Sequence, residues 1–166
     1  HRNGSTKWAD FTNPIWGCEV LVENDEVKGV TGELQPCSGQ NDEGEGFDGA
    51  RDMNHKSTVV QNGYKEYLSK LKDIGFDSWR WDFTKGFPAK YVGEYNASSS
   101  PYFSVGEYWD GNITLLTTWI NNSGNTLTGT TTKSATFDFS LYYELEKALN
   151  GDWAKLNKSG GMPGLT

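Results

Sequence analysis

Residues 78–83 read Ser-Trp-Arg-Trp-Asp-Phe, a short aromatic-rich run that predicts a strand ending near an acidic side chain. Residues 102–107, Tyr-Phe-Ser-Val-Gly-Glu, repeat this arrangement, and residues 135–139 predict a third strand with Asp138 near its end. Helical patterns follow the three runs, at 88–96, 113–121 and 141–149. Three strand-then-helix units in sequence mean parallel strands joined by crossover helices, so the predicted fold class is α/β.

Doubly wound sheets and eight-stranded barrels both begin with such units. No Gly-x-Gly-x-x-Gly follows a predicted strand, so the sequence lacks the motif that would favour a dinucleotide-binding protein. In a barrel, catalytic groups gather at the carboxyl ends of the strands. Asp82 and Glu107 end two successive predicted strands, and we expect them to face one cleft.

The region before the first strand is of two kinds. Residues 58–71 predict a helix with five side chains on one apolar face: Val60, Tyr64, Tyr67, Leu68 and Leu71. Residues 3–51 have little periodicity and are crowded with Gly, Asn, Asp and Glu. A long irregular stretch in a compact domain is usually a functional excursion rather than a plain connection.

The charge and the aromatic content of the chain indicate which partners it can bind. The 166 residues carry 15 Lys and Arg against 22 Asp and Glu, a net charge of −7. Nucleic acid and anionic membranes both call for a basic surface, and no apolar run approaches the roughly 20 residues of a spanning helix. Aromatic residues make up 14% of the chain, too many for a disordered one. An acidic, aromatic-rich and Gly-rich chain fits a secreted protein that handles neutral polymers such as sugars.

The chain has two cysteines, Cys18 and Cys37. One disulfide closing a surface loop is an interpretation suited to a secreted protein. Two unrelated free thiols are the alternative, and the spacing does not choose between them.

The paired carboxylates suit glycosidic bond cleavage, in which one carboxyl protonates the leaving oxygen and the other attacks the anomeric carbon or activates water. Arg80 lies two residues before Asp82, so strand alternation puts both on one face, and a guanidinium keeps a nucleophilic carboxylate ionised. Glu107 has no Arg or Lys within several residues, and an apolar setting suits a proton donor. The alternative is structural: an Arg80–Asp82 salt bridge and a strand-end charge at Glu107.

Two longer motifs carry a resemblance to a known family. Residues 75–87, GFDSWRWDFTKGF, resemble the segment that holds the nucleophile in alpha-amylases of glycoside hydrolase family 13, which in plant and bacterial members reads roughly GFDGWRxDFxKGY. Residues 103–110, FSVGEYWD, are similar to the family's acid/base segment, F-x-V-G-E-x-W-D. The motifs occur in the family's order, with Glu107 following Asp82 by 25 residues.

The resemblance covers essentially the whole chain and implies a partial (β/α)8 TIM barrel with about strands four to six. His1-Arg2 resemble the end of the family's first motif, D-x-V-x-N-H-R. Residues 1–51 are then the end of strand three and the B domain, an irregular excursion with the calcium-binding loop region. Residues 52–166 are the partial catalytic barrel. The family's third catalytic Asp is expected beyond Thr166, so the resemblance implies an internal fragment.

Functional roles are carried over by resemblance onto matching positions. Asp82 is the implied nucleophile, Glu107 the general acid and then base, and Arg80 the residue that orients and ionises Asp82. The implied substrate-binding residues are His1, Lys85, Gly86 and Trp109.

Calcium is the implied cofactor. Ca²⁺ takes six to eight oxygen ligands, and residues 41–52 are dense in them. Asp52 is an implied ligand because residues 52–55, DMNH, resemble the family's PDIDH, and the backbone carbonyl of Gly86 is another. Asp42 and Asp48 are further candidates, for which a merely solvated acidic loop is the alternative.

The activity implied for the parent protein is retaining endo-hydrolysis of alpha-1,4-glucosidic bonds in starch and maltodextrins, by an extracellular monomer. An exo-acting enzyme that forms one maltooligosaccharide and a non-catalytic glucan-binding relative are the alternatives. We expect the isolated 166-residue chain to be inactive, because a few strands cannot close a barrel. Its open edges are expected to expose Trp79 and Trp81.

Overall fold

The computed structural model describes residues 16–23, 38–47, 50–124 and 133–156. The chain forms two compact units. The first runs to Phe76 and also contains Gly86–Pro88, and the second consists of Asp77–Lys85 and the chain from Ala89 onward. This division follows contacts rather than barrel topology, so the sequence-based boundary between residues 51 and 52 stays a prediction.

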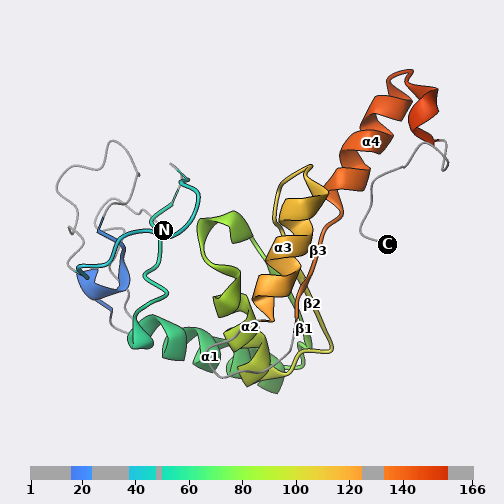
Figure 1. Ribbon diagram of the computed structural model, residues 1–166. Helices are drawn as coiled ribbons and strands as arrows, with labels where there is room; N and C mark the ends of the chain where they lie inside the picture. Colours follow the sequence, from blue (N-terminus) through green and yellow to red (C-terminus); the bar gives the residue numbers. More distant parts are fainter. Residues whose placement is uncertain (1–15, 24–37, 48–49, 125–132, 157–166) are drawn as a thin grey trace, which may run out of the picture. The chain divides into compact units, whose positions relative to one another are not determined.

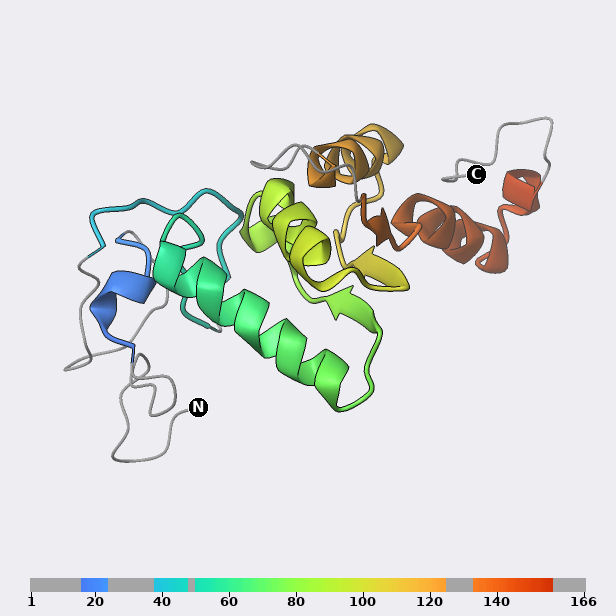
Figure 2. The same ribbon diagram turned by 90° about the horizontal axis from the view of Figure 1, so that it is seen from below.

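The second unit is built on a three-stranded parallel sheet in the order β1-β2-β3 (Figure 1). Its strands are β1 (Ser78–Trp81), β2 (Phe103–Gly106) and β3 (Ala135–Thr136). Its helices are α2 (Ala89–Ser99), α3 (Ile113–Ser123) and α4 (Phe139–Leu149), the last packed against the short η3 (Trp153–Leu156). Figure 2 shows α2 and α3 side by side, in contact with each other. Alternating strands and helices confirm the predicted α/β class.

The third strand is shorter than predicted, and the helix after it begins earlier. The cause is Asp138, which lies at the N-cap of α4 and accepts a hydrogen bond from the Leu141 N–H at 2.9 Å. A side-chain oxygen at this position satisfies one of the N–H groups that a helix start leaves unpaired. Asp138 therefore starts a helix rather than ending a strand.

The expectation that Trp79 and Trp81 would be exposed is wrong. Their side chains are 6% and 9% exposed, and each indole N–H is hydrogen-bonded, Trp79 to Ser99 Oγ at 2.9 Å and Trp81 to Ser104 Oγ at 3.0 Å. The Trp81 ring also stacks on Tyr95 of α2. Strand alternation turns both rings to the buried face of β1, so they are covered even though the sheet has open edges.

Ser104 is a buried hydrogen-bonding centre of the sheet. Its hydroxyl receives N–H groups from Trp81 and Asn96 and lies 2.8 Å from the Ser134 hydroxyl. A hydroxyl has two acceptor sites and one proton. Because two donors fill the acceptor sites, Ser104 must donate to Ser134, whose own proton goes to the Ala135 carbonyl. The chain of hydrogen bonds therefore joins β1, β2 and the start of β3.

A close contact inside the second unit fixes the space between β2 and α3. A Cβ built on Gly106 would lie 2.2 Å from the ring of Trp119, which is 4% exposed. No side chain larger than hydrogen fits there without displacing a buried ring.

The first unit contains α1 (Thr58–Asp73), whose buried side chains are Val60 and Leu68. Tyr67 was predicted to share their face but is 57% exposed. The helix ends where Gly75 takes φ 103°, a left-handed conformation that favours glycine. The Phe76 N–H then bonds back to the Leu71 carbonyl at 3.0 Å.

Among the described residues of the first unit, one small apolar cluster forms a core. Val20, Leu21 and Val60 form its centre, and three partly buried side chains surround it: Trp16, Met53 and Tyr64. Val20 ends a short turn of helix, η1 (Cys18–Val20). Cys18 is disulfide-bonded, which favours the disulfide interpretation, and the chain's other cysteine, Cys37, lies outside the described residues.

Candidate active site

Asp82 and Glu107 directly follow β1 and β2 at the same edge of the sheet. Trp81 lies opposite Gly106 in the parallel register, so the next residue of each strand is also a neighbour. Two backbone hydrogen bonds fix the pair: the Glu107 N–H donates to the Trp81 carbonyl at 2.8 Å, and the Thr84 N–H to the Glu107 carbonyl at 3.2 Å. The structure thus brings together the two carboxylates that the sequence singled out.

Arg80 joins both carboxylates. Its Nη1 pairs with Asp82, and its Nη2 lies 2.8 Å from Glu107 Oε1. The contact with Asp82 was expected from strand alternation. The contact with Glu107 was not, because it depends on the register between β1 and β2. The expectation that Glu107 lies away from any cation is therefore wrong, since Arg80 reaches it from the neighbouring strand.

The chain turns sharply just after Asp82. Phe83 has φ 42°, a left-handed conformation that a non-glycine residue adopts at a cost of about 1–2 kcal/mol. This turn directs the Phe83 N–H toward Glu107 Oε2 at 3.4 Å. Residues held in such conformations concentrate at functional sites, where the surroundings determine them.

The two carboxylates differ in exposure. The Asp82 side chain is 75% exposed and that of Glu107 is 20% exposed. Hydrogen bonding with the Glu107 side chain, and then with Arg80, lowers the pKa of Asp82. An open, readily ionised carboxylate beside a more enclosed carboxyl suits a nucleophile and a proton donor, respectively.

Lys85 and Trp109 also lie in the second unit. Lys85 Nζ is 3.0 Å from Asp110 Oδ2, and both side chains are largely buried. The pKa of Asp110 is lowered by the Asn112 backbone N–H and then by Lys85. Lys85 thus anchors the loop after Glu107, an interaction that sequence reasoning missed because it joins two loops. Trp109, in this loop, is 51% exposed.

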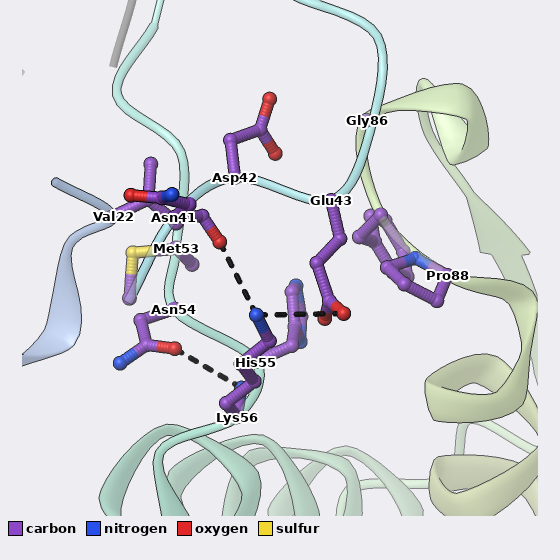
Figure 3. A pocket seen from close by; sticks show the side chains of 11 residues that line it. Val22, Asn41, Asp42, Glu43, Met53, Asn54, His55, Lys56, Gly86 and Pro88 are labelled. Carbon is purple, nitrogen blue, oxygen red and sulfur yellow. Dashed lines mark hydrogen bonds and ion pairs between the residues drawn. The ribbon is translucent and has the colours of Figure 1, made fainter. Parts of the chain in front are cut away.

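The acidic loop of the first unit borders a small pocket with Gly86 (Figure 3). Oxygen donors line it from both sides: Asn41, Asp42, Glu43 and the Gly86 segment. A Cβ on Gly44 would lie 2.3 Å from the Gly86 carbonyl oxygen, so only glycine lets the two backbones approach this closely. Two of the implied calcium ligands, Asp42 and Gly86, therefore border one pocket.

Carboxylate and carbonyl oxygens are the donors that Ca²⁺ prefers, so this pocket fits a hard cation chemically. Within the described residues, no three His, Cys, Asp or Glu side chains gather as a metal-binding group. One positive charge is already supplied by Lys56, whose Nζ lies 3.4 Å from both Glu43 Oε1 and the Asn41 carbonyl. Figure 3 shows Lys56 between these two residues, with the Asp42 carboxylate pointing away from it.

The other implied site residues lie elsewhere. Asp52 is not among the residues that line this pocket, and its backbone carbonyl accepts the Val22 N–H at 3.2 Å. Asp48 and His1 fall outside the described residues. Sequence reasoning also missed Lys56, whose only local signal is its place directly after residues 52–55.

His55 lines the same pocket and is almost fully buried. Its ring stacks on Phe87 with centroids 4.4 Å apart. Burial lowers the pKa of His55 from 6.5 to about 4, because the charged form loses its hydration. The imidazole is therefore neutral at pH 7.

The sequence of the chain is similar to those of known proteins. No protein-family model matches the chain. It is 28% identical over 179 aligned positions to "Probable alpha-amylase 2" of Arabidopsis thaliana, covering 98% of the chain and 41% of that protein. It is 41% identical over 73 residues to "Alpha-amylase 3, chloroplastic" of the same plant, covering 43% of the chain and 8% of that protein. The chain is similar in sequence to plant alpha-amylases.

The chain also shares its fold with a solved structure, "Structure of an Alpha-Amylase from Malbranchea cinnamomea". The TM-score is 0.60 at 18% identity, and the match covers 87% of the chain and 28% of that structure. This likeness confirms the predicted partial barrel. The chain spans less than half the length of the curated relatives it matches. None of the helices in the described ranges has both the length and the apolar composition needed to cross a bilayer.

Proposed function

We propose that this chain carries the nucleophile and the acid/base of a retaining alpha-1,4-glucan hydrolase. The observation that carries the proposal is the arrangement of Asp82 and Glu107 at the ends of adjacent parallel strands, with Arg80 paired to both. Two carboxyl groups on either side of a glycosidic bond are what the reaction requires. The curated relatives, which are named alpha-amylases, support the substrate class.

Asp82 is the nucleophile in this mechanism. Its carboxylate attacks the anomeric carbon while Glu107 gives its proton to the departing glycosidic oxygen, leaving a covalent glycosyl ester on Asp82. Water then attacks the same carbon, Glu107 takes a proton from that water, and Asp82 leaves as a carboxylate. Two displacements at one carbon retain its configuration. Arg80 favours the ionised state of Asp82 throughout.

The substrate in this proposal is starch or a maltodextrin, cut internally. The exposed Trp109 supports a sugar ligand, because an aromatic face packs on the C–H face of a pyranose. Fixed-length exo-action is the alternative within the same chemistry. A non-catalytic glucan-binding role would be favoured by loss of Asp82 or Glu107, and both are present.

Calcium binding is a further part of the proposal. Asp42 and the Gly86 carbonyl would hold the ion at the pocket of the first unit, with Asp48 and Asp52 as the other ligands implied by resemblance. A bound divalent ion supplies positive charge that draws separate oxygen donors together and so stabilises the folded state. The support is the convergence of oxygen donors around Gly86.

We also propose an extracellular, monomeric parent enzyme, and no activity for the 166-residue chain alone. Reaction groups must be held within about 0.5 Å of their productive positions. Three strands form only part of the closed ring of a barrel, so the chain alone supplies only one side of a barrel site.

Activity can be tested in a chimera in which this chain replaces the matching region of the Arabidopsis probable alpha-amylase 2. We expect the chimera to release reducing sugar from soluble starch with retention at the anomeric carbon, read by NMR. Asp82→Asn and Glu107→Gln should each lower kcat roughly 10³-fold or more, because each removes one role in a two-step displacement.

Asp77→Asn is the matched control, since it removes a carboxylate next to β1 and should leave kcat within about twofold. Substantial activity in either active-site variant, or a folded chimera that leaves starch intact, would contradict the proposal. The isolated chain should release no more sugar than its own Glu107→Gln variant.

A further inference from the structure

Trp109 combines high exposure with a fixed orientation. It is 51% exposed although it contacts three aromatic side chains, those of Phe139, Tyr142 and Tyr143. Phe139, which is 8% exposed, packs on one side with centroids 4.4 Å apart. Tyr143 accepts the indole N–H through its hydroxyl oxygen at 2.7 Å. An indole whose N–H is already satisfied has mainly its apolar surface left to offer a ligand.

Tyr143 is itself held against the loop that carries Trp109. A Cβ built on Gly111 would lie 2.9 Å from Tyr143 Cδ2, so the Tyr143 ring lies close against the Gly111 backbone. The same loop is tied down by the Lys85–Asp110 ion pair and by Asp110 Oδ1, which accepts the Asn112 N–H at 2.8 Å. The hydrogen bond between Tyr143 and Trp109 thus links the first half of α4 to the loop that begins at Glu107.

We propose that Tyr143 is a positioning residue that fixes Trp109 as a flat platform for one glucose ring of an alpha-1,4-glucan. The proposal rests on the proposed function and deepens it, because it adds a determinant of glucan affinity that takes no part in the chemistry. A side chain ordered before binding loses less conformational entropy when the ligand arrives. Tyr143 therefore acts on affinity through Trp109, without touching the sugar.

The test uses the 166-residue chain labelled with ¹⁵N, in which indole N–H signals are recorded during titration with maltoheptaose. Trp109→Phe assigns the Trp109 signal. We expect maltoheptaose to shift this signal and cellopentaose, whose beta-1,4 linkages give a straighter chain of the same sugar rings, to shift it much less. Tyr143→Phe removes only the hydroxyl, and it should move the Trp109 signal in the free protein and weaken maltoheptaose binding about threefold to tenfold, the range for one hydrogen bond.

Tyr142→Phe is the matched control. The Tyr142 ring also meets Trp109 edge-on, with centroids 6.4 Å apart, and the substitution keeps this ring while removing a hydroxyl that does not accept the indole N–H. It should therefore change the dissociation constant less than about twofold. The backbone amide spectrum should be the same for both variants, which separates positioning from a loss of structure. A Trp109 signal unmoved by maltoheptaose would overturn the proposal, as would equal binding by Tyr143→Phe and the unsubstituted chain. The proposed function is tested by a different measurement. If the Asp82→Asn chimera still hydrolyses starch, the proposed function fails whatever the binding experiment shows.

Discussion

The two units of this chain are stabilised in different ways. In the second unit, regular elements bury aromatic rings, and the Ser104 hydroxyl links polar groups of three elements. In the first unit, a small apolar core supports a loop held by an ion pair at Lys56 and a stacked, neutral His55. The comparison teaches that the two units should respond to different conditions. We expect the stability of the first unit to depend on pH through His55, and that of the second unit to depend on how its rings pack.

Mild acid should produce the largest difference in stability between the two units. His55 stays neutral when folded, with a pKa of about 4, but takes a proton near pH 6.5 when unfolded. Because the unfolded state binds more protons in this window, the stability of the first unit should fall by about 3 kcal/mol between pH 6.5 and pH 4. Asp82 and Asp110 have lowered pKa values, so their contributions to the second unit persist through this window and fade only below it.

Residue-resolved hydrogen exchange can follow this difference, with amides of α1 reporting on the first unit and amides of β2 on the second. His55→Phe keeps the ring stacked on Phe87 and should abolish the loss in α1 between pH 6.5 and pH 4. Equal loss of protection in α1 and β2, or a loss that survives His55→Phe, would contradict the assignment.

Two glycines offer a matched packing test, one in each unit. A Cβ at Gly106 or at Gly63 would lie 2.2 Å from a tryptophan ring, Trp119 and Trp16 respectively. Gly106→Ala should destabilise the second unit by about 1–3 kcal/mol, because Trp119 is buried and has nowhere to move. Gly63→Ala should be near neutral, because Trp16 is only partly buried and alanine favours helix α1 by about 1 kcal/mol. Denaturant melts of both variants measure this, and similar losses would mean that the first unit is as tightly packed as the second.

The smallest effect should come from Lys56. Lys56→Met removes an ion pair worth at most about 1 kcal/mol, so the calcium-free first unit should weaken slightly. Removing a positive charge near the oxygen donors should also tighten calcium binding about fivefold, since a unit charge and a divalent ion about 8 Å apart in water interact by about 1 kcal/mol.

Lys70→Met is the control for this change, because Lys70 pairs with Glu66 on the exposed side of α1 and lies apart from the pocket lining. Calorimetric titration with calcium, and melting curves with and without a chelator, give both quantities. Equal calcium affinity in the two variants would show that Lys56 does not weaken calcium binding. Identical melting curves with and without the chelator would show that calcium does not stabilise the chain.

The strands, the helices and the two carboxylates could be predicted because their signals are local. Asp82 and Glu107 lie inside short motifs at strand ends, and the parallel order follows from alternating strands and helices. The link from Arg80 to Glu107 could not be read this way, since it arises only when the register puts Trp81 opposite Gly106. The contacts Lys85–Asp110 and Trp109–Tyr143 likewise join loops and helices that are distant in sequence.

The first unit was harder to predict because its contacts follow no period. Nothing in residues 41–56 indicates that Lys56 turns back to Glu43, or that Gly44 meets the backbone of Gly86. The predicted exposure of Trp79 and Trp81 failed for a related reason. An open sheet edge does not imply an open sheet face, and both rings lie on the covered face of β1.

The single hydroxyl of Ser104 has a consequence for how the sheet assembles. Its partners belong to β1, to α2 and to the residue before β3, separated from it by 23, 8 and 30 positions. Contacts over such separations form slowly because long loops must close first. An intermediate with only two strands would lack the acceptor for the Ser104 proton, and leaving such a buried group unpaired is unfavourable. Folding of the sheet should therefore be cooperative, with β3 joining in the same kinetic step that closes β1 on β2.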